Sequence, residues 1–248
     1  LADNIPIEGV QTGRRSIRWR ANEPATLVWT EALDGGDPRK MVPHRDQLFA
    51  LSAPFDSQPR ELVKVQYRFT GLTEFADSNL LVVTEMDRDR RWTRTLMHDQ
   101  RVPNAEPVIL MDRSLRDRYG DPGQLVTEVS DNGQRLVRQD GDWVYRTGAG
   151  ASPQGNLPFL DRQNLKTLAT ERLWRCEEGF FESPVRILES GAERKPIVLT
   201  SRESNDLPPN FYRKDLQTGT ESPVTMFTDP TPQIRGITKQ LVKYERAD

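Results

Sequence analysis

Short runs of alternating apolar and polar residues recur along this chain, and turn-forming residues separate them. The runs are rich in β-branched and aromatic side chains, as strands are. They lie at 16–19, 26–29, 47–51, 62–69, 81–84, 125–129, 135–138, 143–145, 197–200 and 211–214. No window of about 12 residues has the periodicity of an amphipathic helix, and only 113–119 favours a short one. The pattern predicts an all-β protein.

The turns between the runs predict how neighbouring strands pair. Asn132 and Gly133 lie between the apolar residues Val129 and Leu136. An Asn-Gly pair in that setting is the strongest short-range signal for a β-hairpin. The segment 241–248 alternates in the same way and predicts a final strand.

Four of the predicted strands have a similar setting, because each precedes a polar loop and then a second strand. Their central residues are Trp29, Val83, Tyr145 and Leu199, which are 54, 62 and 54 residues apart. Four-stranded units that repeat at about 40–60 residues are typical of propeller blades, which bury their faces by stacking on neighbours. The spacing predicts a partial β-propeller of about four blades of antiparallel four-stranded sheets. An ordinary β-sandwich is the alternative.

Composition narrows the function classes. The 35 Lys and Arg residues nearly balance the 37 Asp and Glu residues, for a net charge of −2, so we expect neither nucleic acid nor an anionic membrane as a partner. The longest apolar run, near 80–83, is far shorter than the roughly 20 residues of a membrane span. Two His and one Cys leave little material for a metal site, and we expect no metal and no cofactor.

The few residues with catalytic or metal-binding chemistry have structural interpretations. His44 and His98 are 54 residues apart, with no Cys beside either, and are expected to form hydrogen bonds in loops or at strand edges. Cys176 follows Leu173 and Trp174 and is expected in the core.

Several stretches resemble a known family when they are taken together and in order. They are 24–38 (PATLVWTEALDGGDP), 42–46, 87–92, 117–123 (DRYGDPG), 150–155, 158–161 and 229–233. The chain resembles the glutamyl endopeptidases of bacteria and plants, a branch of the prolyl oligopeptidase family of serine peptidases. The resemblance covers essentially the whole chain.

The resemblance implies a division of labour. In that family a β-propeller caps a C-terminal α/β-hydrolase domain, so residues 1–234 are expected to be the later part of the propeller. Residues 235–248 would be its closing strand or the start of the hydrolase domain. The implied function is to gate and orient peptide substrates for that missing domain. A stand-alone propeller-like module that binds a partner protein is the alternative. For a bacterial member, the resemblance suggests the periplasm or export.

The sequence contains no recognisable nucleophile for the hydrolysis of a peptide bond. An α/β-hydrolase places its serine in Gly-x-Ser-x-Gly, followed along the chain by an acid and a histidine. Here the nearest imitation surrounds Ser152, with one residue too many before the final glycine, and both histidines precede it. We therefore assign no catalytic residue to this chain and expect the triad of the parent protein beyond residue 248.

A group of arginines is the candidate for a substrate-lining surface. Arg88, Arg90 and Arg91 lie close together in the sequence, and Arg202 occupies the corresponding loop of the fourth repeat. Guanidinium groups at the mouth of a propeller would attract acidic peptides, because they pair bidentately with carboxylates. The alternative, which we favour, is that neighbouring aspartates such as Asp87 neutralise them in surface ion pairs.

The two ends suggest a piece of a longer protein. Residue 1 is Leu, and the first residues show neither the basic nor the apolar region of a signal peptide. An incomplete set of blades would leave strand edges unprotected, so we expect self-association through them.

Overall fold

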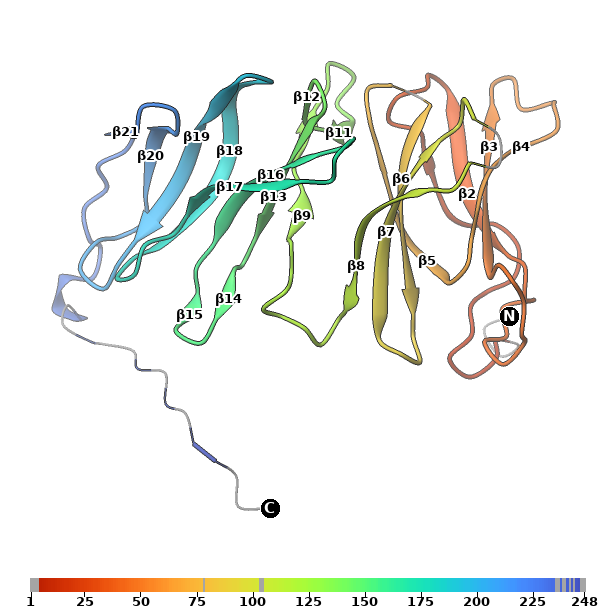
Figure 1. Cartoon of the computed structure of the whole chain (residues 1–248), viewed down its shortest axis with the longest axis horizontal. Coiled ribbons are helices and arrows are strands. Elements are labelled where there is room, and N and C mark those ends of the chain that lie inside the picture. The colour runs from red at the N-terminus through yellow and green to blue at the C-terminus, as the bar shows by residue number, and fades with distance from the viewer. Residues whose placement is uncertain are drawn as a thin grey trace. The chain divides into compact units, whose positions relative to one another are not determined.

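The structure, a computed structural model, describes residues 5–77, 79–102 and 105–234, and the single positions 237, 240, 242, 244 and 245 (Figure 1). Regular structure in these ranges is antiparallel β-strand, apart from the 3-10 turn η2 (Pro232–Ile234). No helix among the described residues has the length and apolar character needed to cross a membrane. The chain divides into two compact units, of which the first runs up to Asp117 and includes Thr127–Val137.

The first unit contains two antiparallel four-stranded sheets, each in chain order. One sheet consists of β1 (Arg15–Trp19), β2 (Thr26–Ala32), β3 (Asp46–Ser52) and β4 (Arg60–Val65). The other consists of β5 (Arg68–Glu74), β6 (Leu80–Asp87), β7 (Trp92–Asp99) and β8 (Val108–Ser114). The unit also includes a hairpin of β10 (Thr127–Val129) and β11 (Arg135–Val137), so the hairpin predicted around Asn132 and Gly133 is confirmed.

The second unit contains Arg118–Val126 and the residues from Arg138 onward. Its first sheet has the order β12 (Gln139–Asp140), β13 (Trp143–Gly148), β16 (Phe159–Asn164) and β17 (Thr170–Arg175), and β9 (Gln124–Leu125) also pairs with β13. Its second sheet has the order β18 (Phe181–Gly191), β19 (Arg194–Glu203), β20 (Asn210–Asp215) and β21 (Thr220–Pro223). A small hairpin of β14 (Ala151–Ser152) and β15 (Gly155–Asn156) completes the unit's strands in the described ranges.

The predicted fold class is confirmed. The described chain is all-β, with antiparallel sheets of the four-stranded blade type. Trp29, Val83, Tyr145 and Leu199 lie on β2, β6, β13 and β19, which are internal strands of the four large sheets. The domain boundary at 234/235 stays a prediction, because most of 235–248, including most of the strand expected at 241–248, lies outside the described residues.

One predicted strand is in fact two. The run 62–69 reads as continuous, but β4 ends at Val65 and β5 begins at Arg68 in the next sheet. The bend between them is held by the backbone N–H of Tyr67, which donates to Oε2 of Glu85 at 2.8 Å. Alternation continues through the bend, so the sequence pattern contains no sign of the change of sheet.

The prediction of a short helix at 113–119 is wrong. Arg113 and Ser114 instead close β8, where they pair with Thr93 and Trp92 of β7. A turn follows, in which the Arg113 guanidinium donates to the carbonyl of Asp117 at 2.8 Å. Pairing with β7 therefore decides the conformation of a segment whose local preference is weak.

The sheets of the first unit bury a shared apolar core. Val28, Leu48 and Val65 from the first sheet contact Leu72, Leu81 and Val83 from the second. All six are at least nine-tenths buried. The internal strand β2 is accordingly buried along most of its length, whereas four of the five residues of the edge strand β1 are exposed.

Arg68 connects the same two sheets at one end. From the start of β5, its guanidinium donates to Asp46 of β3 at 2.6 Å and to Asp34 at 2.5 Å. Asp46 also accepts the backbone N–H of Phe69 at 2.7 Å, and Asp34 accepts that of Gly36 at 2.9 Å. Both carboxylates are almost completely buried, so each needs these donors to offset its loss of hydration.

Arg20 and Glu74 form a second connection. Arg20 follows β1 and donates through Nε to Oε1 of Glu74, the last residue of β5. The backbone N–H of Ala21 donates to the other carboxylate oxygen at 3.0 Å. Arg20 is 3% exposed and Glu74 is 1% exposed. The two sheets are thus joined through buried charges as well as through the apolar core.

The second unit combines an apolar core with a polar connection of another kind. Tyr145, Leu160 and Leu173 of its first sheet pack on Ile187 and Val198 of its second. Nearby, the Arg138 guanidinium donates to the hydroxyl of Ser190 on β18 at 2.7 Å. That hydroxyl donates in turn to Asp140 of β12 at 2.5 Å. A hydroxyl therefore bridges a cation and an anion between these two sheets.

The first prediction concerns the connection through Glu74. The substitution Glu74→Gln keeps the shape of the side chain but removes one of the two carboxylates that pair with the buried Arg20, the other being Glu23 at 2.9 Å. Because Glu23 still pairs with Arg20, we expect the loss to be about 1–3 kcal/mol, below the cost of leaving a buried charge with no partner. We expect urea denaturation of the chain to show that loss in the unfolding free energy of the first unit.

The control is Arg39→Gln, which removes a guanidinium that is 82% exposed and pairs with Asp37 at 3.0 Å. It is expected to leave the transition unchanged. Equal stability of the Glu74→Gln and wild-type chains would show that the buried pair does not stabilise the first unit.

Candidate functional site

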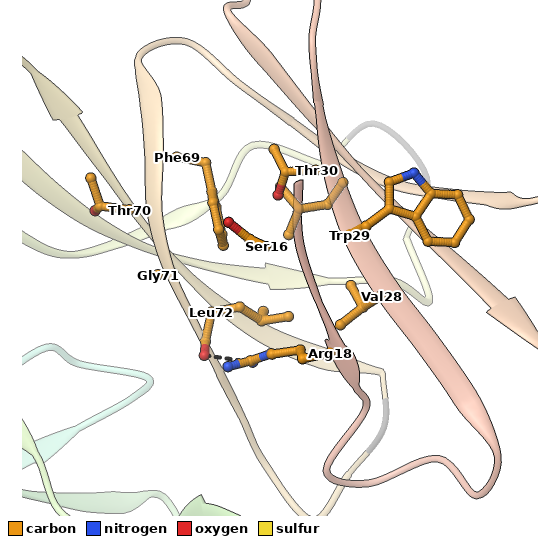
Figure 2. Close-up of a pocket in the computed structure, with 10 residues that line it drawn as sticks. Ser16, Arg18, Val28, Trp29, Thr30, Phe69, Thr70, Gly71 and Leu72 are labelled. Carbon is orange, nitrogen blue, oxygen red and sulfur yellow. Dashed lines mark hydrogen bonds between the residues drawn. The ribbon is translucent and has the colours of Figure 1, made fainter. Parts of the chain in front are cut away.

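A first cleft of about 170 Å³ opens between the two sheets of the first unit (Figure 2). Its walls come from β1, β2, β3 and β5 and combine apolar with hydroxyl side chains. The lining residues are Ser16, Arg18, Val28, Trp29, Thr30, Leu48, Phe69, Thr70, Gly71 and Leu72. Arg18 lies at one end, where its guanidinium donates to the carbonyl of Leu72 at 2.6 Å (Figure 2). This volume suits one side chain and not a whole ligand.

A second, larger cleft shares two of those residues. It measures about 500 Å³ and lies between β1, β5 and the β10–β11 hairpin. Its lining residues are Arg18, Trp19, Ala21, Leu72, Thr73, Glu74, Thr127, Gly133, Gln134 and Arg135. The hairpin is held against the sheet by the side chain of Asn132, which donates to the carbonyl of Ala21 at 3.3 Å. A cleft of this size is in the range of small-ligand sites, about 300–1,000 Å³.

The two clefts share Arg18 and Leu72, and Arg18 is the charged residue of the two. Its side chain is 45% exposed, and its guanidinium lies 3.5 Å from a carboxylate oxygen of Glu74. Partial burial lowers the pKa of Arg18 from its ordinary value, an effect that Glu74 opposes and Arg20 reinforces. The group stays a cation at neutral pH, and it lines both clefts.

The structure places three of the predicted arginines at one turn. Arg88, Arg90 and Arg91 all belong to the connection between β6 and β7, and Arg91 adopts a φ of 51° there. Arg88 lies 3.8 Å from the carboxylate of Glu8. Arg90 lies 3.9 Å from Asp87, and its guanidinium is stacked 5.0 Å from the Trp92 ring. These are exposed, loosely paired side chains, and none of the three lines either cleft.

Arg202 belongs to the second unit and has a different environment. It lies on β19 and not in the predicted loop, and its guanidinium is 4.4 Å from the Tyr212 ring and 5.3 Å from the Phe180 ring. It donates to Glu221 of β21 at 2.7 and 3.0 Å. It also donates to Glu182 of β18 at 3.0 Å. The predicted group is therefore divided between two units, and this member is engaged in a network within its own sheet.

Lys214 completes that network from β20. Its Nζ lies 3.1 Å from Glu182 and 2.9 Å from Glu221. The four strands of this sheet thus each contribute one charged side chain, with the two cations on the central strands and the two carboxylates on the edge strands. Hydrogen bonds from Arg202, the largest cause, and from Lys214 lower the pKa of Glu221 from 4.5 to about 2.

Of the remaining candidates, Ser152 and Cys176 have structural environments, and His98 lacks the hydrogen bond expected of it at Nε2. Ser152 lies in the β14–β15 hairpin and donates to the carbonyl of Gly155 at 2.8 Å, which is the bonding of a turn. His98 has a pKa lowered to about 4 by burial, and its Nε2 has no partner among the described atoms, so the predicted hydrogen bond is not observed there. Cys176 is buried, as expected. Within the described ranges, no group of three His, Cys, Asp or Glu side chains is arranged to hold a metal ion.

Comparison with known proteins gives a match over the full length of the chain. The chain is 33% identical over 263 residues to a probable chloroplastic glutamyl endopeptidase of Oryza sativa subsp. japonica. It is 34% identical over 264 residues to one of Arabidopsis thaliana. Both alignments cover 100% of this chain. The chain is related to the glutamyl endopeptidases. The resemblance predicted from the sequence motifs is confirmed.

The match to the glutamyl endopeptidases concerns only a part of them. The chain spans 28% of the rice protein and 27% of the Arabidopsis protein. No family model matches the chain. The chain is therefore similar, over its whole length, to a segment of these glutamyl endopeptidases.

The solved structures that align with this chain do so with low TM-scores and low sequence identity. An oligogalacturonate lyase in complex with manganese aligns at a TM-score of 0.49 and 11% identity, over 81% of this chain and 50% of that one. Oligopeptidase B from Leishmania major aligns at 0.41 and 12% identity, over 85% and 33% of the two chains. At these scores the alignments carry no weight in assigning a function.

The second prediction concerns the acid response of the second unit. Because the pKa of Glu221 is lower in the folded chain, its ion pairs stabilise the fold above pH 4.5, and this contribution is lost as the pH falls toward 2. The variant Glu221→Gln lacks that contribution from the start. We expect it to be less stable than the wild type at pH 6 and to lose less stability between pH 6 and pH 3.

Urea midpoints of the second unit's transition measure this difference. The matched control is Glu189→Gln, also on this sheet, whose carboxylate is 58% exposed and lies 3.6 Å or more from its arginine partners. An identical pH response of wild type and Glu221→Gln would contradict the stabilising role of the network.

Proposed function

We propose that this chain is a non-catalytic propeller segment of a serine peptidase, and that it gates and orients peptide substrates for an α/β-hydrolase domain elsewhere in the same protein. The observation that carries the proposal is the full-length match to a 27–28% portion of glutamyl endopeptidases. The blade-type sheets support it, because such sheets form covers that select substrates by access and orientation.

The chemistry of the chain agrees with this division of labour. The sequence has no Gly-x-Ser-x-Gly, and Ser152 is bonded to a turn carbonyl and not to a base. Acyl transfer requires a nucleophile, a base and donors for the oxyanion at one place. The hydrolytic step is therefore proposed to occur in the hydrolase domain, with peptides as the substrates of the whole protein.

A stand-alone module that binds a partner protein is the second candidate. It is favoured by exposed apolar side chains on two strands that form sheet edges, Ile17 and Trp19 on β1, and Phe181 and Val185 on β18. The two candidates differ in what the complete gene encodes. A downstream Gly-x-Ser-x-Gly with a later acid and histidine supports the peptidase, and a stop codon directly after Asp248 supports the module.

The third prediction tests the absence of catalysis in this chain. A fluorophosphonate probe, which labels activated serines, is expected to label the full-length protein and to leave this chain unlabelled. Heat-denatured full-length protein serves as the control for non-specific labelling. Labelling of the isolated chain at Ser152 or any other serine would contradict the proposal.

The fourth prediction concerns association between copies of the chain. Within the described residues, β1 and β18 pair with a strand on one side only, and they expose apolar side chains; both features favour pairing with another chain. We expect sedimentation velocity of the isolated chain to show concentration-dependent dimers or larger species. The variant Trp19→Lys is expected to reduce them, because a charge on an edge strand opposes pairing. A strictly monomeric chain at all concentrations would contradict the expectation.

The four arginines predicted from the sequence are candidates for a substrate-lining surface in this proposal. Arg88, Arg90 and Arg91 are exposed enough to meet an acidic peptide. Arg202 is committed to Glu182 and Glu221, so a substrate would have to compete with two carboxylates for its guanidinium. The arginines in the turn between β6 and β7 are therefore better candidates than Arg202 for contact with an acidic substrate.

A further inference from the structure

The second cleft has an excess of positive charge. Arg18 and Arg135 both line it, and Glu74 is the one carboxylate among the lining residues. Glu74 is already bonded by Arg20 through one oxygen and by the backbone N–H of Ala21 through the other. Its separation from Arg18, 3.5 Å, is the longest of these contacts. Little of the Glu74 charge is thus left to neutralise Arg18.

Arg135 has still less compensation. On β11 its Nε donates to the hydroxyl of Thr127 at 2.9 Å, and a terminal nitrogen donates to the Thr127 carbonyl at 3.3 Å. Both acceptors are neutral, and no ion pair of Arg135 occurs among the described residues. The hydrogen bonds hold the guanidinium beside the cleft without cancelling its charge.

An aromatic surface adjoins these cations. Trp19 lines the cleft and is 53% exposed, and its ring centroid lies 6.2 Å from that of Phe55. The bulge between Arg15 and Arg18, with Ser16 at a φ of 54°, changes the register of β1 just before these residues. Bulges re-aim the side chains that follow them, and they are frequent next to binding sites.

We propose that the second cleft binds a carboxylate of a peptide segment, which Arg18 and Arg135 hold while a neighbouring apolar side chain rests on Trp19. Guanidinium groups suit a carboxylate because two parallel N–H donors match its two oxygens. An exposed tryptophan suits an apolar side chain because it offers a large rigid surface. The carboxylate is supplied by a chain terminus or by an acidic side chain. That the ligand is a peptide rests on the proposed function.

The fifth prediction is a binding measurement on the complete 248-residue chain, with dye-labelled peptides followed by fluorescence polarisation. One peptide, dye-Ala-Ala-Ala-Leu, has a free terminal carboxylate. The second, dye-Ala-Glu-Leu-Ala-amide, has an acidic side chain only, and the third, dye-Ala-Gln-Leu-Ala-amide, has neither. We expect at least one of the first two to bind about tenfold more tightly than the third, as the loss of a charge-assisted hydrogen bond predicts. The arm that binds identifies the source of the carboxylate.

Two variants test the assignment of the cations. Arg135→Gln is expected to weaken binding of the charged peptide about tenfold and to leave the uncharged peptide unaffected. Arg18→Gln is expected to have the same effect, and thermal melting of each variant shows whether it is folded. The matched control is Arg39→Gln, an exposed arginine of the first unit that lies outside the cleft. Raising the salt concentration is expected to weaken only the charged peptide.

The proposal is overturned if all three peptides bind equally or not at all, or if folded Arg135→Gln binds the charged peptide as the wild type does. A failure of the proposed function is a separate result. A full-length protein that a serine-reactive probe does not label would end the peptidase interpretation, and selective binding of the carboxylate by this chain would remain.

Discussion

The ion pairs between Arg68, Asp34 and Asp46 are the interaction on which the first unit depends most. Apolar surfaces attract without direction, so two stacked sheets that bury only apolar faces can shift along each other at little cost. A buried carboxylate is costly unless its partners are in place, and Asp46 receives hydrogen bonds from Arg68 and Phe69 of the next sheet in addition to its ion pair with Arg15 of its own sheet. Stacking and register are thereby fixed together. Arg20 and Glu74 repeat the arrangement at the other end of β5.

This use of charge explains why so few of the chain's many ionisable groups are candidates for chemistry. Glu85 receives Arg94 and the N–H of Tyr67, Asp161 receives Arg172, and Glu182 receives Arg202 and Lys214. Each carboxylate stabilises strands in a sheet or the passage to the next one. Arg18 and Arg135 both line one cleft, Arg18 beside a Glu74 that is already bonded by Arg20 and Arg135 beside neutral acceptors, and this gives the cleft its distinct electrostatic character.

Much of the fold could be predicted from the sequence because strands and hairpins are local. Alternation located most of the internal strands, though not β7 or β16, and Asn132-Gly133 identified the β10–β11 hairpin. The break between β4 and β5 could not be predicted, because the contact that holds it joins Tyr67 to Glu85, 18 residues away. The clefts were missed for the same reason. Arg18 and Arg135 are far apart in the sequence and lie in no motif, and only tertiary packing places them together.

The functional account claims that this segment controls access to a hydrolase domain. The most direct measurement gives the full-length protein one cleavable sequence in three contexts: a short peptide, a loop of a stably folded protein, and the same protein unfolded and kept soluble. The account predicts cleavage of the peptide and the unfolded chain at comparable rates and at least tenfold slower cleavage of the folded protein. Equal cleavage of the sequence in all three contexts would contradict it.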